Sequence, residues 1–245
     1  MTRRLRFALF APAAAGFGAL LVWAVTGLPA FGSTEHRYGY LVNHIATPER
    51  HMTNAVTALV FDYRGFDTMG EEFILFTAVT GVVLLLRDRE RERGRGRSDS
   101  VRSDVIRVAG VLGVGVGVLV GLWLVAFGFV TPGGGFQGGV AVASGGVLLY
   151  VAADYSSWER VGRLEVLEPL EGVGAGAYVV IGLAALVSGL PFLTNLLGPG
   201  DVGTVWSGGS AALVNWAAGT EVAAANLLLF REFLEEYIVP LGAES

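Results

Sequence analysis

The sequence predicts an all-α, polytopic membrane protein with about six transmembrane helices, and three observations support this prediction. Of the 245 residues, 53% are hydrophobic and only 16% are charged, whereas a soluble domain carries about 25% charged residues. The apolar residues collect in runs close to the roughly 20 residues that a helix needs to cross a bilayer. The 36 glycines follow no collagen period and stand inside these runs, where membrane helices tolerate them.

The N-terminal region predicts two membrane helices. Residues 7–31 follow three arginines and carry no charge, which favours a retained helix over a signal peptide, whose apolar core is about 7–15 residues long. A polar loop with all three histidines is expected over 32–51. Residues 52–62 are too few to span the membrane and predict a short helix that is either interfacial or covered by protein. The second membrane helix is expected at about 69–86.

The strongest break in composition is the segment 87–107, which holds eight arginines interleaved with acids, glycine and serine. This pattern is typical of a solvated linker and predicts a domain boundary. After it we expect a third helix at about 105–130 and a fourth that runs to about 153. A mixed-charge loop (154–171) precedes the fifth helix at about 172–190. The sixth helix is expected at about 205–230.

The arginines also predict the orientation. With six crossings and both termini in the cytoplasm, the inner segments hold all the arginines except Arg37, Arg50 and Arg64. Such a bias agrees with the positive-inside rule. A separate crossing by residues 52–62 would move the arginine-rich linker outside, so the bias favours one net crossing between 52 and 86.

Several classes of function are excluded by composition. The chain has no cysteine, which removes disulfides, iron–sulfur ligation and a cysteine nucleophile. It also has no lysine, which removes a Walker-type loop and a Schiff base. A net charge of −5 argues against nucleic acid as a partner. No catalytic triad, paired-acid site, metal site or cofactor is expected; a histidine metal site in the 32–51 loop is the weaker alternative.

A glycine-rich segment is predicted to break the chain between the third and fourth helices. It matches the spacing of a dinucleotide fingerprint, but that fingerprint needs a preceding strand, and apolar helices flank it here. We expect either a simple outer turn or a break that lines a cavity. The helix before it carries Gly113, Gly117 and Gly121, a ladder that predicts a helix-packing face. The helix-break motif comprises Pro132, Gly133, Gly134, Gly135, Phe136, Gln137, Gly138 and Gly139.

Glu221 is the leading candidate for a residue of an ion or proton pathway. It lies inside the sixth predicted helix among alanines and Gly219. A carboxylate at the bilayer centre costs about 2.5–3.5 kcal/mol and is a functional candidate by default; the alternative is a structural pairing with a donor elsewhere. Asn215 and Asn226 share a different face and are expected to make interhelical hydrogen bonds.

A second group of pathway candidates lies between the short helix and the next membrane helix. These residues could pair with one another, or could form an ion entrance together with a partner. Glu71 has a further interpretation, because Thr68-x-x-Glu71 fits a capping box at the start of a helix. The candidates are Asp62, Arg64, Asp67 and Glu71.

Two sets of motifs resemble known families. Residues 27–32 (GLPAFG) and 56–71 (VTALVFDYRGFDTMGE) resemble the C-terminal MbhE-like segment of the large Mrp antiporter subunit. Residues 132–139 (PGGGFQGG), with Gly200-Asp201, Asn215 and 219–222 (GTEV), resemble the MnhB/MrpB family. The resemblance implies two domains, an MbhE-like module (1–95) and an MnhB-like module (96–245). Phe129 and Val130 before the proline segment, and Glu72 after the expected acid, depart from the family pattern.

The resemblance implies a multi-pass subunit of the bacterial plasma membrane, part of a hetero-oligomeric Na⁺/H⁺ antiporter, and a transporter subunit rather than an enzyme. Such a subunit would assist assembly and could line the ion or proton path, with Na⁺ and H⁺ as transported ions and the lipid bilayer around it. Channel lysines would lie in partner subunits, because this chain has none. The alternative is a subunit of a complex I-like membrane-bound hydrogenase or a related redox-driven ion pump.

Overall fold

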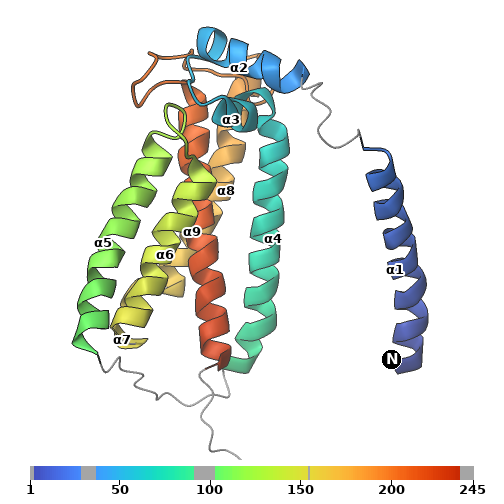
Figure 1. Cartoon of the computed structure of the whole chain (residues 1–245), viewed down its shortest axis with the longest axis vertical. Helices are drawn as coiled ribbons and strands as arrows, with labels where there is room; N and C mark the ends of the chain where they lie inside the picture. The colour runs from blue at the N-terminus through green and yellow to red at the C-terminus, as the bar shows by residue number, and fades with distance from the viewer. Residues whose placement is uncertain (1–2, 29–36, 91–102, 154, 238–245) are drawn as a thin grey trace, which may run out of the picture. The chain divides into compact units, whose positions relative to one another are not determined.

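The computed structural model of the chain describes residues 3–28, 37–90, 103–153 and 155–237, and all regular elements within these ranges are helices (Figure 1). This confirms the all-α prediction. The chain divides into two units, which we describe separately. The first contains α1 (Arg3–Thr26), whose apolar stretch Phe10–Thr26 is shorter than the spans of the second unit. The second unit begins at Leu41.

The second unit is a bundle of five helices that are each long and apolar enough to cross a membrane. In Figure 1, α9 runs through the middle of the bundle, with α5 and α6 on one side and α4 on the other. The apolar stretch of α9 is also more buried than that of any of the other four helices. The helices are α4 (Gly65–Glu90), α5 (Asp104–Ala126), α6 (Gly135–Ala152), α8 (Leu164–Val187) and α9 (Ser210–Tyr237).

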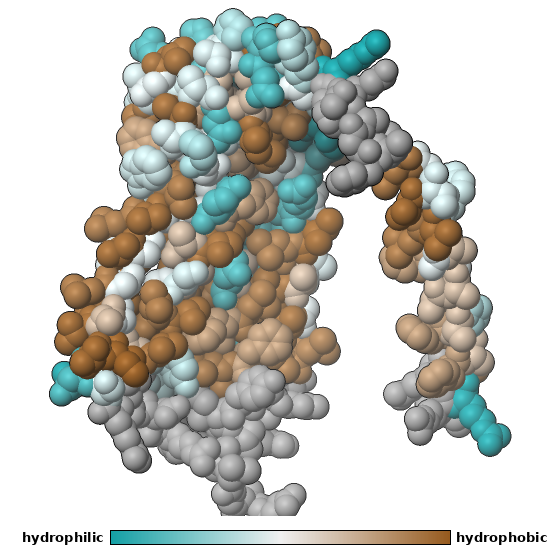
Figure 2. Space-filling model, viewed as in Figure 1, coloured by the Kyte–Doolittle hydropathy of each residue, from teal (hydrophilic) through white to brown (hydrophobic). Residues whose placement is uncertain are grey.

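Apolar side chains cover the flank of the bundle, whereas polar side chains gather at the end where α2 and α3 lie (Figure 2). Large exposed apolar residues, such as Leu85, Leu119 and Val187, stand on the outer faces of three different helices. A surface of this kind is stable against lipid tails or partner helices rather than water. The chain is therefore a multi-pass membrane protein.

The predicted polar loop over 32–51 is wrong for the residues that are described, because Arg37–Arg50 form helix α2. Val42 and Ala46 are four residues apart and both are buried, so one helical face is apolar although the segment as a whole is polar. His36 lies outside the described residues. The short helix expected over 52–62 is confirmed as α3 (Ala55–Ala58) and a π-helical turn η1 (Leu59–Tyr63).

The predicted loop over 154–171 is also wrong. Helix α7 (Tyr155–Val161) occupies its first part, and α8 already begins at Leu164. Trp158 is buried against the ring of Phe230, with ring centroids 4.8 Å apart. Charged residues on the outer face of this segment concealed the helical period of its inner face, which runs through Leu167 and Glu171.

The arginine-rich linker is described only at its ends. Residues 87–90 continue α4, and α5 begins at Asp104. The predicted boundary between residues 95 and 96 lies outside the described residues. Helix α4, from the first predicted module, packs against α9 of the second. The division into two modules therefore stays a prediction, and the two share one helical core.

The glycine ladder of α5 packs against α6, as predicted. A Cβ atom built on Gly121 would lie 2.7 Å from the Gly138 carbonyl oxygen, and one on Gly117 would lie 3.5 Å from the Cα of Gly145. Without side chains at these positions the two backbones approach closely. The ladder therefore serves packing within this chain.

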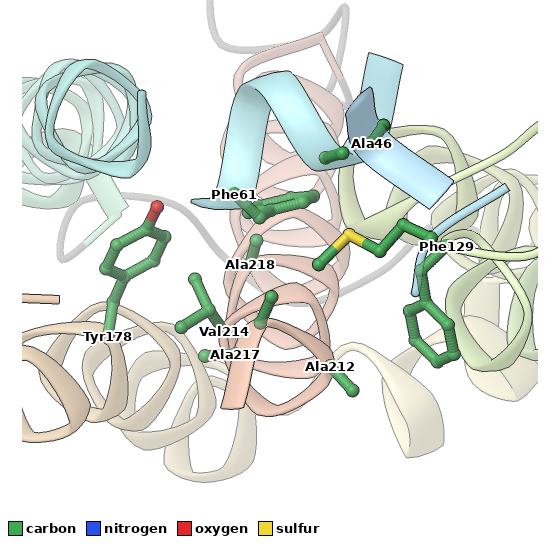
Figure 3. Close-up of a cluster of buried hydrophobic side chains, with 11 residues drawn as sticks. Ala46, Phe61, Phe129, Tyr178, Ala212, Val214, Ala217 and Ala218 are labelled. Atoms are coloured by element: carbon green, nitrogen blue, oxygen red, sulfur yellow. The ribbon is translucent and has the colours of Figure 1, made fainter. Parts of the chain in front are cut away.

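Two apolar clusters fill the interior, one near each end of the bundle. The first contains Phe61, Phe129, Tyr178 and Ala218 (Figure 3). The second contains Val79, Trp158, Leu167, Ala225 and Leu228. Along α4, α8 and α9, a short stretch separates the residues of one cluster from those of the other, and the candidate site lies in that stretch.

Candidate functional site

Glu221 occupies the gap between the two clusters on α9. It follows Ala218 of the first cluster and precedes Ala225 of the second, and its exposed fraction is 0%. Helix α8 approaches it closely, since a Cβ atom on Gly174 would lie 2.7 Å from the Glu221 Cβ. The predicted small-residue surroundings of Glu221 are thus present, and they bring a second helix against its carboxyl group.

Glu72 occupies the same gap on α4, with an exposed fraction of 1%. The carboxyl groups of Glu72 and Glu221 are close enough to interact directly. Among the described residues, no group donates a hydrogen bond to any of their four oxygens. Two carboxyl groups that face each other without a donor are most stable when they share a proton.

Glu171 occupies the gap on α8 between Leu167 and Tyr178. Its exposed fraction is 4%, and its carboxyl group interacts with those of Glu221 and Glu168. We call Glu72, Glu171 and Glu221 the carboxyl layer. None of the three forms a salt bridge with another described residue. The layer is therefore a set of buried acids from three helices without a cationic partner in the described part of the chain.

The layer is not a metal centre within the described residues. No three His, Asp or Glu side chains there are placed to hold one ion. His51 instead has its Nδ1 against the Gly200 carbonyl oxygen, which ties the start of α3 to the loop before α9. Neighbouring carboxyl groups of this kind are chemically able to pass protons to one another.

The four clustered charges predicted around residues 62–71 are separated by the fold. Arg64 Nε donates to Asp67 Oδ2 at 2.6 Å, and both side chains are exposed. Asp62 pairs instead with Arg50 of α2, at 2.8 Å between Nε and Oδ2. Burial raises the pKa of Asp62 above its ordinary value, and the Arg50 guanidinium opposes this rise.

Glu71 lies on the exposed side of α4, next to the buried Glu72. The predicted capping box is wrong, because α4 already begins at Gly65. The Thr68 hydroxyl donates to the Val60 carbonyl oxygen at 2.6 Å and so caps the preceding turn. Asp67 and Glu71 are one helical turn apart and are both exposed, so they are available to a partner chain.

The glycine-rich segment breaks the chain between α5 and α6, as predicted. Gly133 and Gly134 have φ angles of 154° and 144°, while α6 begins at Gly135. Asn215 holds this break from α9: its Nδ2 donates to the Val125 carbonyl oxygen and its Oδ1 accepts from the Gly135 N–H, both at 2.6 Å. The interhelical role predicted for Asn215 is confirmed.

Asn226 behaves differently from Asn215. Its Nδ2 donates to the Val222 carbonyl oxygen of its own helix, at 2.8 Å. The interhelical hydrogen bond predicted for it is wrong, because this intrahelical acceptor one turn earlier satisfies the amide.

The α3 segment also binds the break. Asn54 Nδ2 and Thr57 Oγ1 both donate to the Gly128 carbonyl oxygen, at 2.6 and 2.7 Å. These bonds connect the first predicted module to the second. They hold the turn after α5 in one geometry, since Gly128 also lies against Gly134.

Sequence reasoning treated Glu72 only as a departure from a family pattern and placed Glu171 in a loop. A helical period of three and four residues through Leu167, Glu171, Gly174 and Tyr178 was the signal that could have found Glu171. For Glu72 no such signal exists, because choosing between it and Glu71 requires the rotation of α4 in the bundle.

Comparisons with known proteins agree with this architecture. A curated protein of Methanocaldococcus jannaschii, described as uncharacterized, is 30% identical over 174 residues, which cover 63% of this chain and 64% of that protein. A protein of Rhizobium meliloti, described as a probable K⁺/H⁺ antiporter component, is 31% identical over 218 residues, covering 79% of this chain and 21% of the relative. The chain thus spans less than two thirds of the length of each of these relatives.

Two solved structures share the fold. A chain of the membrane-bound sulfane sulfur reductase, an archaeal respiratory membrane complex, aligns with a TM-score of 0.67 and 27% identity over 94% of this chain and 98% of that chain. A chain of the Mrp complex from Dietzia sp. DQ12-45-1b aligns with a TM-score of 0.65 and 24% identity. The alignment covers 95% of this chain and 26% of the Dietzia chain.

A family model described as a domain related to the MnhB subunit of Na⁺/H⁺ antiporter matches residues 105–228. The match takes in α5, α6, α7, α8 and most of α9, with the glycine break, Glu171 and Glu221. The chain therefore belongs to the MnhB family of Mrp-type antiporter subunits.

Proposed function

We propose that the chain is a membrane subunit of a multi-subunit monovalent cation/proton antiporter, and that its carboxyl layer exchanges protons during transport. Membership of the MnhB family and the similarity to the Rhizobium antiporter component support the first part. The transported cation is proposed to be Na⁺. The chain is proposed to act as a transporter subunit in the plasma membrane rather than as an enzyme.

The observation that carries the proposal is the burial of three carboxyl groups that form no salt bridge in the described part of the chain, five of whose six oxygens have no hydrogen-bond donor there. Each ionised carboxylate at the bilayer centre costs about 2.5–3.5 kcal/mol on insertion scales. An apolar or amide side chain would fill the same space without that cost. The cost is explained if the layer accepts and releases protons.

The proposed partners are the other subunits of a hetero-oligomeric complex. Asp67 and Glu71 form an exposed acidic pair on α4, close to exposed Phe73 and Ile74. We propose that a partner covers this face, so that Glu71, with Arg64 and Asp67, belongs to a path between subunits while Glu72 belongs to the path within this chain. The MbhE-like module and cytoplasmic termini remain part of this proposal.

Ion exchange in everted vesicles tests the proposal, with the whole complex carrying Glu72→Gln or Glu221→Gln. Glutamine keeps the size of the side chain but cannot carry a proton. We expect exchange to fall by about 100-fold, within the range that a positioned proton-transfer group contributes, while partner subunits still co-purify. Glu165→Gln, an exposed acid of α8, is the matched control. Wild-type exchange in both layer variants would refute the proposal.

A redox-driven ion pump is the second candidate function. The sulfane sulfur reductase chain is matched over nearly its whole length, so the same fold occurs in a respiratory complex. Purification in mild detergent distinguishes the two. Iron–sulfur or nickel subunits among the co-purified partners would favour the redox pump, whereas antiporter-type subunits alone favour the antiporter.

A further inference from the structure

A pocket of about 370 Å³ opens at the end of the bundle where η1 and the start of α4 meet the loop between α8 and α9. Its polar wall contains the Arg50–Asp62 ion pair and Asn195, and its apolar wall contains Phe192 and Leu193. Leu193 has a φ angle of 62°, a left-handed conformation that is uncommon for a bulky residue. Such conformations persist where the surrounding structure imposes them, often at functional sites.

The first residue of α4 separates this pocket from the interior. Gly65 lines the pocket, and its carbonyl oxygen accepts a hydrogen bond of 2.8 Å from the Tyr178 hydroxyl. A Cβ atom on Gly65 would lie 3.7 Å from the same hydroxyl and 3.5 Å from Leu193 Cδ1. A side chain at this position would therefore stand between the pocket and Tyr178.

Tyr178 connects this position with the carboxyl layer. It rises from α8 with its hydroxyl pointing away from that helix (Figure 3), and its exposed fraction is 1%. The hydroxyl lies within hydrogen-bonding reach of the Thr68 side chain, and the Glu72 carboxyl group is near enough to act on it electrostatically. Thr68 and Glu72 are one turn apart on α4, so the three groups form a polar series within an otherwise apolar cluster.

We propose that the pocket is the water-filled mouth of a proton route, and that the Tyr178 hydroxyl relays protons between the pocket and Glu72. In one step, the hydroxyl rotates away from the Gly65 carbonyl oxygen and donates its proton toward the Glu72 carboxylate. The phenolate then accepts a proton from a hydronium ion in the pocket, which becomes water, so one proton enters from the pocket, one passes to Glu72, and tyrosine is unchanged. This inference rests on the proposed function and names the entrance to the same site.

The first test compares Tyr178→Phe with Tyr150→Phe in the assembled complex. Both variants remove one hydroxyl from a tyrosine of the bundle, but Tyr150 packs against the second apolar cluster, at the other end. We expect Tyr178→Phe to lower exchange about tenfold or more, since a positioned proton-transfer group contributes about 10²–10⁴-fold. Tyr150→Phe should leave exchange within about twofold of wild type.

The second test does not depend on how Tyr178→Phe folds. The chain has no cysteine, so a single cysteine can be labelled without background from this chain. A membrane-impermeant methanethiosulfonate bound at Thr194→Cys, inside the pocket, should block exchange. The same label at Val202→Cys, an exposed position outside the pocket, should not.

The outcomes separate this inference from the proposed function. If Glu72→Gln abolishes exchange while Tyr178→Phe and the labelled Thr194→Cys complex exchange normally, the layer functions but this entrance is refuted. If Glu72→Gln exchanges normally, the proposed function itself fails. Loss of exchange in all three, with both controls active, supports the route.

Discussion

The two sides of α9 are packed by different means. On the α6 side, glycines meet backbone to backbone, for example Gly139 against Gly219. On the α4 and α8 side, the same helix buries Glu221 against Glu72 and Gly174. Close backbone packing fixes the first interface, because interhelical contacts in lipid depend on van der Waals fit. The second interface retains acids that have no cationic partner among the described residues, a cost that the proposed proton exchange would account for.

The largest effect is expected when the acids on the α4 and α8 side of α9 are replaced. If Glu72 and Glu221 act as one proton-sharing unit, the double variant Glu72→Gln/Glu221→Gln should lose no more exchange than either single variant, about 100-fold, because residues that act as a unit are non-additive. Exchange rates of the three variants in everted vesicles measure this. Losses that multiply would show two independent groups.

The second largest effect is expected when a glycine contact on the α6 side of α9 is filled. In Gly139→Ala, the new Cβ would lie 2.8 Å from both the Gly219 carbonyl oxygen and Val222 Cβ. Overpacking of this kind costs about 1–3 kcal/mol, so the melting temperature of the detergent-solubilised complex should fall. Gly176→Ala is the control, since its Cβ meets nothing within 4 Å. Equal melting temperatures for both variants would contradict the packing role.

A smaller effect comes from the amide that joins three helices at the glycine break. Asn215→Leu leaves the Val125 carbonyl oxygen and the Gly135 N–H without the Asn215 amide. We expect a loss of about 1–2 kcal/mol in the free energy of unfolding, measured by denaturant titration. Asn226→Leu, which removes a bond within α9, should cost less; an equal loss would contradict the bridging role.

The smallest effect concerns Asp62, outside the membrane spans. Because burial raises its pKa from 3.8, the folded state binds more protons than the unfolded state just above that pH. The contribution of Asp62 to stability is therefore greatest below pH 3.8 and declines as the pH rises through the folded pKa. The melting temperature of Asp62→Asn relative to wild type should rise from about pH 4 to about pH 7. A difference independent of pH would contradict this.

The composition and the apolar runs were sufficient to predict the helical membrane fold, because the bilayer sets the length and polarity of a spanning helix. They were insufficient for α2, α7 and the start of α8, where only one face is apolar and the other carries charges. The glycine ladder and Asn215 were predicted correctly, since small and amide side chains in apolar runs have few roles besides packing and interhelical bonding.

The sequence by itself determined that this chain has acids within its membrane helices and no lysine to pair with them. Tertiary structure decided which acids meet. The rotation of α4 turns Glu72 inward and Glu71 outward, the extension of α8 brings Glu171 beside Glu221, and Tyr178 reaches Gly65 across 113 residues of sequence. Helix rotation and register depend on packing summed over whole faces, which no local pattern of residues specifies.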